Sequence, residues 1–303
     1  MQLRILLTGA NGQLGWELRR SLAPLGEIIA VDRNALDLAL PERIFQTLQH
    51  LQPGLVVNAA AYTAVDQAER EPDLADRINH HAVAAMAEYC ATAGVGLLHF
   101  STDYVYHGTP VRPWEETQAA DPANEYGKSK LRGEQAILQS GCAHLILRTS
   151  WVYATRGRNF LRTIVRLARE RDQLSVVNDQ VGAPTWARAL AEVTTSLVSQ
   201  LGPSPQSLAQ LNRYSGIYHA TAEGQTTWYE FARAILALIP DPKRKCQELI
   251  PISTFEYKPL AQRPSYSKLS CDKLFDVFGL RFESWEHALR QALDGVSVDQ
   301  LLP

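Results

Sequence analysis

Tyr126 and Lys130 are four residues apart, and together their side chains could move a proton. If residues 126–139 are helical, this spacing places both side chains on one face. A free phenol has a pKa of about 10, and a nearby ammonium favours the phenolate and so lowers that pKa. The pair could donate a proton to a carbonyl oxygen or remove one from an alcohol. Because many surface helices carry the same spacing, this interpretation depends on the rest of the chain.

A glycine-rich turn follows the first predicted strand, residues 4–8, and precedes a predicted helix with leucines at helical spacing. Its glycines have the spacing G-x-x-G-x-x-G, a variant of the dinucleotide fingerprint. Gly9 would allow the tight turn, and Gly12 would let a pyrophosphate approach the N–H groups at the helix start. Gly15 would let the helix pack close to the strand. The pattern predicts a dinucleotide site, with an ordinary strand-to-helix turn as the alternative.

The residues after the second predicted strand, 28–31, bear on the choice of coenzyme. Asp32 stands near the position where an acidic residue binds the adenosine ribose. Its carboxylate would favour NAD, because it repels a 2′-phosphate. Arg33 could instead pair with that phosphate. We therefore expect the protein to use NADPH or NADH.

Composition indicates a soluble enzyme. The chain has 303 residues and a formal net charge of −2, which gives no general attraction to nucleic acid or an anionic membrane. Its cysteines (Cys90, Cys142, Cys246 and Cys271) are scattered without a C-x-x-C motif, which favours reduced thiols and a cytoplasmic location. No apolar run approaches membrane-spanning length, and no signal peptide is evident. We expect neither nucleic acid nor a membrane as a partner.

Strands and helices alternate along the first half of the chain, with further strands predicted at residues 55–58, 96–101 and 145–148. A long Ala-rich helix is predicted at residues 73–92. Such alternation with apolar strands predicts an α/β fold with a doubly wound, Rossmann-like parallel sheet. Ligands bind such sheets at the carboxyl ends of the strands. The polar segments 58–63, 101–103 and 149–151 fall at such ends and should converge there.

The second half of the chain has a looser pattern, which indicates a smaller α/β substrate domain. We expect residues 1–152 to form the dinucleotide-binding domain, with the chain returning to it around 174–219. The substrate-binding domain is then expected to comprise residues 153–173 and 220–303.

Several motifs occur together along the chain, at residues 9–15, 58–66, 101–106, 126–130, 148–153, 178–185, 227–229 and 263–264. In combination they resemble the extended short-chain dehydrogenase/reductase superfamily and, more narrowly, the dTDP-4-dehydrorhamnose reductase family. The resemblance covers most of the chain. It implies NAD(P)H-dependent reduction of the C4 ketone of dTDP-4-dehydro-β-L-rhamnose to dTDP-L-rhamnose, and hence a dTDP-sugar as the substrate. A monomer or a homodimer is expected.

The resemblance also implies roles for individual side chains. Tyr126 would donate the proton, and Lys130 would lower its pKa and bind the nicotinamide ribose. Thr102 would take the place of the usual catalytic serine and stabilise the developing alkoxide. Because side chains alternate along a strand, only one of Ser101 and Thr102 should line the site, and we choose Thr102. Asp103 and Trp151 join Thr102 as expected substrate contacts.

The expected cofactor-binding residues include Tyr126 and Lys130. The others are Gly9, Asn11, Gly12, Gln13, Leu14, Gly15, Asp32, Arg33, Asp37, Leu38, Ala59, Ala60, Ala61, Tyr62 and Thr63. Candidate partners for the substrate's pyrophosphate are Arg158, Arg162, Arg263 and Lys268, because an arginine fork matches phosphate oxygens.

Alternative functions remain open at this stage. Sugar-nucleotide 4,6-dehydratases carry a glutamate where this chain has Tyr104, so an elimination mechanism is disfavoured. A 4-epimerase uses the same tyrosine and lysine, and only the resemblance speaks against it. The regulatory subunit of methionine adenosyltransferase, which is not catalytic, also resembles this family. The alternative to an enzyme is therefore a regulatory protein that binds a dinucleotide but has no catalytic activity.

No metal site is predicted. His80 and His81 lack further ligands at metal-binding spacing, so a solvated or capping role is expected. Some members of the reductase family bridge a dimer with magnesium on glutamates, and Glu17 matches one of them. Arg188 stands where the second magnesium-binding glutamate would be expected, and no clear third glutamate occurs around Asp294. Because a hard cation needs several oxygen ligands, we predict that this protein lacks the magnesium bridge.

Overall fold

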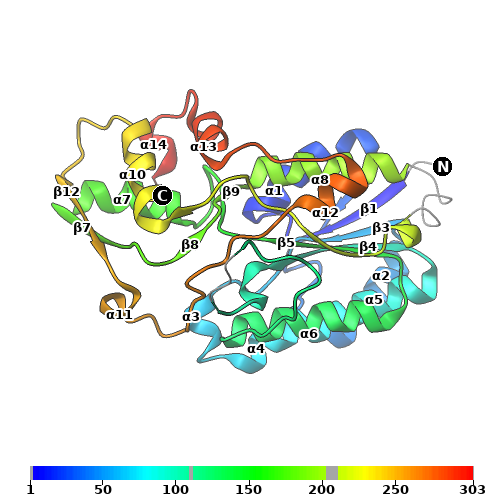
Figure 1. Cartoon of the computed structure of the whole chain (residues 1–303). Coiled ribbons are helices and arrows are strands. Elements are labelled where there is room, and N and C mark those ends of the chain that lie inside the picture. The colour runs from blue at the N-terminus through cyan, green and yellow to red at the C-terminus, as the bar shows by residue number, and fades with distance from the viewer. Residues whose placement is uncertain (1–2, 109–111, 203–210, 303) are drawn as a thin grey trace.

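A six-stranded parallel sheet forms the centre of the molecule (Figure 1). The structure is a computed structural model, which describes residues 3–108, 112–202 and 211–302. The strands are β1 (Leu3–Thr8), β2 (Gly26–Ala30), β3 (Leu55–Asn58), β4 (Gly96–Thr102), β5 (His144–Thr149) and β10 (Gly216–His219). Their order is β10-β5-β4-β3-β1-β2, and all neighbours are parallel. The predicted doubly wound sheet is confirmed.

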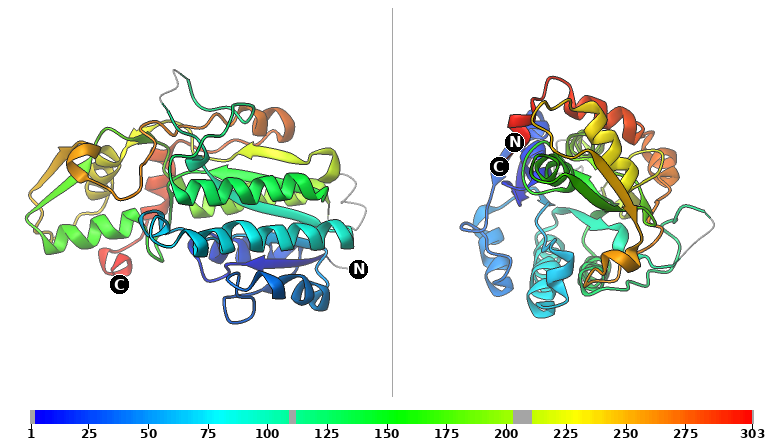
Figure 2. Two further views of the ribbon diagram at one scale, coloured as in Figure 1. Left: turned by 90° about the horizontal axis from the view of Figure 1, so that it is seen from below. Right: turned by 90° about the vertical axis from the view of Figure 1, so that its left-hand side faces the viewer.

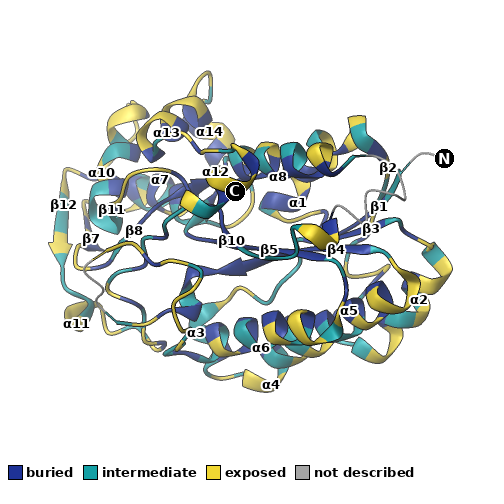
Figure 3. Cartoon of the chain, turned by 45° about the vertical axis from the view of Figure 1, so that its right-hand side comes forward, coloured by how far each residue is buried: buried dark blue, intermediate teal, exposed yellow. Residues whose placement is uncertain are grey.

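Apolar side chains alternate between the two faces of the sheet. In β1, Ile5 and Leu7 join the core on one face, and Leu6 joins the core on the other. Both faces therefore need a covering layer. The first is covered by α1 (Gln13–Ser21), α8 (Ala187–Leu201) and α12 (Asp272–Phe278), and the second by α2 (Ile44–Leu51), α5 (Ala82–Ala93) and α6 (Glu125–Ser140). Figure 3 shows the buried strands between helices whose outer faces are exposed.

Helix α6, which carries Tyr126 and Lys130, has a clear signal at each end. The side chain of Asn124 accepts a hydrogen bond from the backbone N–H of Gly127 at 2.8 Å, which caps the first turn. Gly141 ends the helix with φ +73°, a left-handed conformation that glycine adopts without strain. These local signals explain why the predicted helix, residues 126–139, is confirmed to within one residue at each end.

The predicted helix at residues 73–92 is interrupted in the structure. It consists of α4 (Pro72–Asp76), a π-helical turn η3 (Arg77–His81) and α5. In that turn the buried Asn79 side chain accepts from the backbone N–H of Tyr62 at 2.9 Å and donates to the Ser129 hydroxyl at 3.0 Å. Single π-helical turns occur mostly inside α-helices. Because the contacts of Asn79 are all distant in sequence, the helical periodicity could not predict this turn.

A second apolar core lies at the other end of the molecule (Figure 2). It is built from α7 (Phe160–Glu170), α10 (Trp228–Leu238), α13 (Trp285–Leu293), α14 (Val298–Leu301) and the parallel pair β7 (Gln173–Val177) and β12 (Glu248–Ile252). The remaining elements in the described part of the chain are short. They are β6 (Val152–Tyr153), β8 (Val181–Gly182), β9 (Thr185–Trp186), β11 (Thr226–Thr227), α3 (Val65–Ala68), α11 (Thr254–Tyr257), η1 (Ala23–Leu25), η2 (Pro41–Arg43) and η4 (Asp103–Val105).

The packing differs from the predicted domain boundaries at two places. Within the predicted return, residues 174–219, helix α8 and strand β10 do join the sheet, but β7 pairs with β12 and its Leu174 and Val176 belong to the second core. Within residues 220–303, α12 packs on the sheet through Leu274 and Phe278. Both differences arise from pairings across long stretches of sequence. The division into two domains itself stays a prediction.

No helix within residues 3–108, 112–202 and 211–302 is long and apolar enough to cross a membrane.

Replacement of Gly133 by alanine should lower the free energy of unfolding by about 1–3 kcal/mol. A Cβ at Gly133 would overlap the carbonyl oxygen of Asn79, where α6 crosses the π-helical turn. Helix propensity alone predicts the opposite, a gain of about 1 kcal/mol. Urea denaturation followed by circular dichroism measures the difference, with the exposed α6 variant Gln139→Ala as the control. A stabilised Gly133→Ala protein would contradict the close crossing.

Candidate active site

A cavity of about 710 Å³ opens at the carboxyl ends of the central strands. Segments that follow β1, β3, β4 and β5 contribute to its wall, as do residues near the start of α7 and α10. The predicted residues that line it are Gly9, Asn11, Gly12, Gln13, Leu14, Ala59, Ala60, Ala61, Thr63, Thr102, Asp103, Tyr126, Lys130, Trp151 and Arg158. The predicted convergence of the three polar segments at this edge of the sheet is confirmed.

The glycine-rich turn forms one wall of this cavity. Gly9 has φ +66°, and a Cβ there would lie 2.8 Å from the backbone of Ala59 and Ala60. A Cβ on Gly15 would overlap the carbonyl oxygen of Gly9, so the close approach of α1 requires glycine there. Helix α1 begins after Gly12 with no side-chain cap and no acidic residue in its first turn. Its free N–H groups fit the pyrophosphate of a dinucleotide.

The residues expected near the adenosine lie outside the cavity lining. Asp32 Oδ1 accepts hydrogen bonds from the backbone N–H groups of Asn34 at 3.0 Å and Ala35 at 3.2 Å. Arg33 is exposed, with its Nε 3.4 Å from Asp37 Oδ2. Leu38 is buried in the core between the sheet and α2. The roles of these residues toward a coenzyme stay predictions.

Tyr62 also lies outside the cavity lining, although its neighbours Ala61 and Thr63 belong to it. Its hydroxyl donates to Glu71 Oε2 at 2.8 Å. Burial and this carboxylate raise the pKa of Tyr62 to about 12. The phenol is therefore held against α4 instead of the cavity.

Tyr126, Thr102 and Asp103 form a compact acid–base group at the cavity wall. Thr102 Oγ1 lies 3.1 Å from Asp103 Oδ1 and accepts from the backbone N–H of Tyr104 at 3.1 Å. Burial raises the pKa of Tyr126 to about 12, although its hydrogen bond with Thr102 lowers it and the Asp103 charge raises it further. The phenol therefore holds its proton at neutral pH and can donate it to a developing alkoxide.

Lys130 does not interact with Tyr126 in the predicted way. Its buried Nζ donates to the carbonyl oxygen of Phe100 at 2.6 Å and lies 3.0 Å from His99 Nε2. Burial lowers the pKa of Lys130 to about 8, while Glu134 opposes this shift. The prediction that Lys130 lowers the Tyr126 pKa is not borne out by this geometry, because the amine is directed at β4.

Ser101 and Thr102 both line the cavity, so the prediction that only one would do so is wrong. Alternation separates neighbours along a strand, but β4 ends at Thr102 and the cavity surrounds the end of that strand. Ser101 Oγ and Thr149 Oγ1 are buried without a hydrogen-bond partner in the part of the chain that the structure describes. Because buried polar groups are normally paired, both oxygens offer hydrogen bonds to a polar ligand.

An aromatic stack closes another side of the cavity. Trp151 has φ +47°, an uncommon conformation for a bulky residue, and its indole stacks on that of Trp228 at 3.6 Å between centroids. A Cβ on Gly182 would lie 2.5 Å from the Trp151 ring, so only glycine permits this position. Trp228 was not predicted as a site residue. The 227–229 motif was the available signal, but nothing in it indicated the partner of the ring.

The four candidate phosphate partners do not converge. Arg158 lines the cavity. Arg162 donates to the backbone carbonyls of Leu301 at 2.8 Å and Leu302 at 2.6 Å.

The other two are also engaged elsewhere. Arg263 pairs with Asp66 at 2.6 Å. Lys268 donates to the Ala222 carbonyl at 3.0 Å and lines a separate cavity of about 260 Å³. Of the four, Arg158 alone is placed by the structure to meet a ligand in the large cavity.

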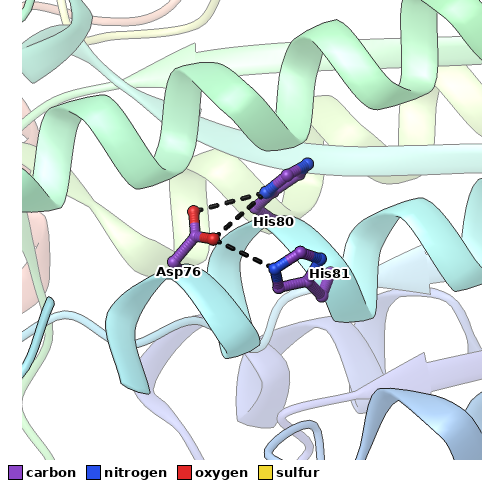
Figure 4. A group of neighbouring side chains, drawn as sticks. All are labelled: Asp76, His80 and His81. Carbon is purple, nitrogen blue, oxygen red and sulfur yellow. Dashed lines mark hydrogen bonds and ion pairs between the residues drawn. The ribbon is translucent and has the colours of Figure 1, made fainter. Parts of the chain in front are cut away.

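His80 and His81 are near a carboxylate, which the sequence did not indicate. Both rings lie within 3.3 Å of Asp76 oxygens (Figure 4), and this spacing could suit a metal ion. Arg132 Nε also pairs with Asp76, at 2.5 Å. A cation would have to displace this guanidinium or tolerate its charge, so the geometry disfavours a metal ion here. The expected solvated or capping role of the two histidines stays a prediction.

Glu17 and Arg188 form an ion pair, with Nε 3.2 Å from Oε2. The sequence predicted that an arginine here would oppose a metal at Glu17, and the pairing supplies a physical reason. The absence of a magnesium bridge stays a prediction.

Comparisons with known proteins give a consistent result. The family described as RmlD substrate binding domain matches residues 3–298. The chain is 44% identical over 291 residues to dTDP-4-dehydrorhamnose reductase of Burkholderia thailandensis, which covers 95% of this chain and 97% of that protein. It is 43% identical over 301 residues to the Salmonella typhimurium protein of the same name, with 96% and 97% covered.

Solved structures include a similar protein. The crystal structure of dTDP-4-dehydrorhamnose reductase from Bacillus anthracis in complex with NADP superposes with a TM-score of 0.86 at 34% identity. The match covers 98% of this chain and 100% of that chain.

Replacement of Asp103 by asparagine should flatten the pH dependence of stability. Burial raises the pKa of the Asp103 carboxyl to about 7. The protonated form is therefore favoured in the folded state, and its stabilisation is present below about pH 4 and lost as the pH rises through about 7. Between about pH 5 and pH 8 the free energy of unfolding of the wild type should fall by roughly 2–3 kcal/mol more than that of Asp103→Asn.

Chemical denaturation at both pH values measures this difference. The exposed Asp121→Asn variant is the matched control and should follow the wild type. If the free energies of unfolding of the wild type and Asp103→Asn change in parallel with pH, burial does not raise the pKa of Asp103.

Proposed function

This chain belongs to the RmlD substrate binding domain family, and from that membership we propose that it is an NAD(P)H-dependent ketoreductase. The proposed reaction is reduction of the C4 ketone of dTDP-4-dehydro-β-L-rhamnose to dTDP-L-rhamnose. Its curated relatives carry the name dTDP-4-dehydrorhamnose reductase. We further propose that the protein acts in the cytoplasm, as a monomer or a homodimer.

The observation that carries the proposal is one cavity with a protonated phenol and a dinucleotide cradle. Tyr126 and the turn at Gly9 and Gly12 line the same 710 Å³ space. The substrate ketone would lie between them, with its oxygen near the Thr102 hydroxyl. A hydride and a proton together convert the ketone to an alcohol, and the acid–base group supplies the proton.

In the proposed mechanism the nicotinamide coenzyme supplies the hydride for C4 when it is bound. The Thr102 hydroxyl, which donates to Asp103 Oδ1 in the structure, turns to donate to the ketone oxygen and so stabilises the charge that develops there. Tyr126 transfers its phenolic proton to that oxygen, and its raised pKa keeps the proton available. The hydroxyls of Ser101 and Thr149, which have no hydrogen-bond partner among the described residues, are available to bind polar groups of the substrate.

NADP in the related Bacillus anthracis structure supports a nicotinamide coenzyme for this chain. We propose that NADPH and NADH both bind, because Asp32 and Arg33 have opposite effects on a 2′-phosphate. Among the described residues, the Arg33 side chain pairs with Asp37 alone, at 3.4 Å on the surface, so its guanidinium can turn to a phosphate.

Tyr126→Phe should lose about 10²–10⁴-fold in turnover, the usual contribution of a general acid. The variant should still bind NADPH, because the ring and the glycine cradle remain. NADPH oxidation with enzymatically generated dTDP-4-dehydro-L-rhamnose measures the first quantity, and fluorescence titration with NADPH the second.

Tyr153→Phe is the matched control, because Tyr153 is buried outside the cavity and its hydroxyl has no partner among the described residues. Full activity of Tyr126→Phe would contradict its role. A folded wild type that binds NADPH but oxidises none would favour the regulatory alternative, and activity only on another ketosugar would favour a different reductase.

Arg33→Ala should weaken NADPH binding by about tenfold or more and leave NADH binding unchanged, because it removes a charged hydrogen-bond donor for the 2′-phosphate. Titration with each coenzyme measures the two dissociation constants. Arg43→Ala, which removes another exposed arginine, controls for the change in net charge. An equal effect on the binding of both coenzymes would mean that Arg33 does not contact the 2′-phosphate.

A further inference from the structure

A buried polar chain links the sheet to helix α6. It consists of Thr8, Asn58, His99 and Lys130, which come from β1, β3, β4 and α6 and are each at most 2% exposed. Thr8 Oγ1 lies 2.6 Å from Asn58 Oδ1, Asn58 Nδ2 lies 3.0 Å from His99 Nδ1, and His99 Nε2 lies 3.0 Å from Lys130 Nζ. Neither the fold nor the proposed chemistry has assigned a role to His99.

Two donors favour one orientation of the Asn58 amide. The backbone N–H of Ala60 lies 3.2 Å from Asn58 Oδ1 and 3.3 Å from Thr8 Oγ1, and the Thr8 hydroxyl donates to Asn58 Oδ1. An NH₂ group at that position would face another donor. The amide nitrogen of Asn58 is therefore directed at His99 Nδ1, to which it donates a hydrogen bond.

This donor determines where the ring proton of His99 lies. Burial and the nearby Lys130 lower the pKa of His99 well below its usual value, so the ring is neutral. A neutral imidazole has one N–H and one acceptor nitrogen. Because Nδ1 accepts from Asn58, the proton belongs on Nε2, where it points at Lys130 Nζ.

An ammonium group cannot accept that hydrogen bond, because it has three donors and no lone pair. The arrangement therefore matches an uncharged Lys130 amine, which accepts from His99 Nε2–H and donates to the Phe100 carbonyl at 2.6 Å. For Lys130 to carry a charge, Nε2 must become the acceptor. The His99 proton then moves to Nδ1, and the Asn58 amide must turn its oxygen toward the ring.

The other charged groups around Lys130 do not remove this conflict. Glu134, one turn along α6, favours the ammonium, but its carboxylate already forms a buried pair with Arg148 of β5 through both oxygens. Tyr126, one turn earlier on α6, keeps its proton and is neutral. His99 is therefore the titratable group in direct contact with the amine.

We propose that His99 is a positioning residue that couples the charge of Lys130 to the orientation of the Asn58 amide. With the Asn58 nitrogen toward the ring, His99 holds an uncharged amine against β4. With the oxygen toward the ring, His99 accepts from the ammonium. The coupling itself follows from the hydrogen bonds, and its effect on turnover rests on the proposed reductase function.

Nitrogen-15 NMR of histidine-labelled protein tests the coupling without any assay of activity. His99 is assigned as the signal missing from the His99→Gln variant among the eight histidines of the chain. We expect the His99 proton to move from Nδ1 to Nε2 as the pH rises through about 8, where Lys130 loses its charge. One tautomer from pH 7 to pH 10, or a charged ring, would overturn the inference, whatever the protein catalyses.

Asn58→Asp provides the kinetic test. The carboxylate at residue 58 can still accept from Thr8 and Ala60, and its second oxygen accepts from His99 Nδ1–H. While that carboxylate is ionised, Nε2 is the acceptor, so the ammonium of Lys130 is favoured. Lys130 lines the cavity and is the predicted partner of the nicotinamide ribose, so loss of its charge should weaken coenzyme binding and lower kcat/KM above about pH 8. In Asn58→Asp this alkaline fall should move up by at least one unit.

The exposed Lys128→Met variant makes the net charge more negative by one, as Asn58→Asp does, and should keep the wild-type profile. An unchanged alkaline fall in a folded Asn58→Asp protein would overturn the coupling. The NMR result on the wild type decides the inference if that variant does not fold. A protein that shows the tautomer change but no reductase activity would contradict the proposed function and leave the coupling intact.

Discussion

Burial of the Lys130 amine between α6 and the end of β4 is the constraint on which the site depends. An amine in that position must be satisfied by hydrogen bonds, because an unpaired buried charge costs several kcal/mol. The Phe100 carbonyl and His99 satisfy it, and both belong to β4. Helix α6 must therefore keep a fixed register against the strand. That register also places Tyr126 at the cavity, beside the Thr102 hydroxyl at the end of the same strand.

The fold and much of the cavity could be predicted because their signals are local. Apolar runs and glycine turns mark the strands, and the order of these elements implies a doubly wound sheet with its ligand site at the carboxyl ends. The turn at Gly9 illustrates this point. Its positive φ and its contact with Ala59 follow from the need for a tight turn after β1. Tyr126 was indicated by its helical spacing from Lys130, whereas Thr102 was predicted from the resemblance to the reductase family.

Contacts between residues far apart in the sequence could not be predicted. The spacing of Tyr126 and Lys130 predicts one helical face, but not that the amine turns to β4 instead of the phenol. The pairing of β7 with β12 joins segments separated by about 70 residues, so the local pattern assigned β7 to the wrong core. The partner of Trp151 was missed for the same reason, because Trp228 comes from a distant helix.

Delivery of a hydride to carbon 4 of a ketosugar is tested most directly by isotope transfer. NADPH with deuterium at the transferred position would be incubated with the protein and dTDP-4-dehydro-L-rhamnose, and the product would be examined by NMR. We expect one deuterium on C4 of the sugar and dTDP-L-rhamnose as the product. Oxidation of the coenzyme without deuterium on C4, or an unchanged ketosugar in the presence of folded, NADPH-binding protein, would contradict the proposed hydride transfer.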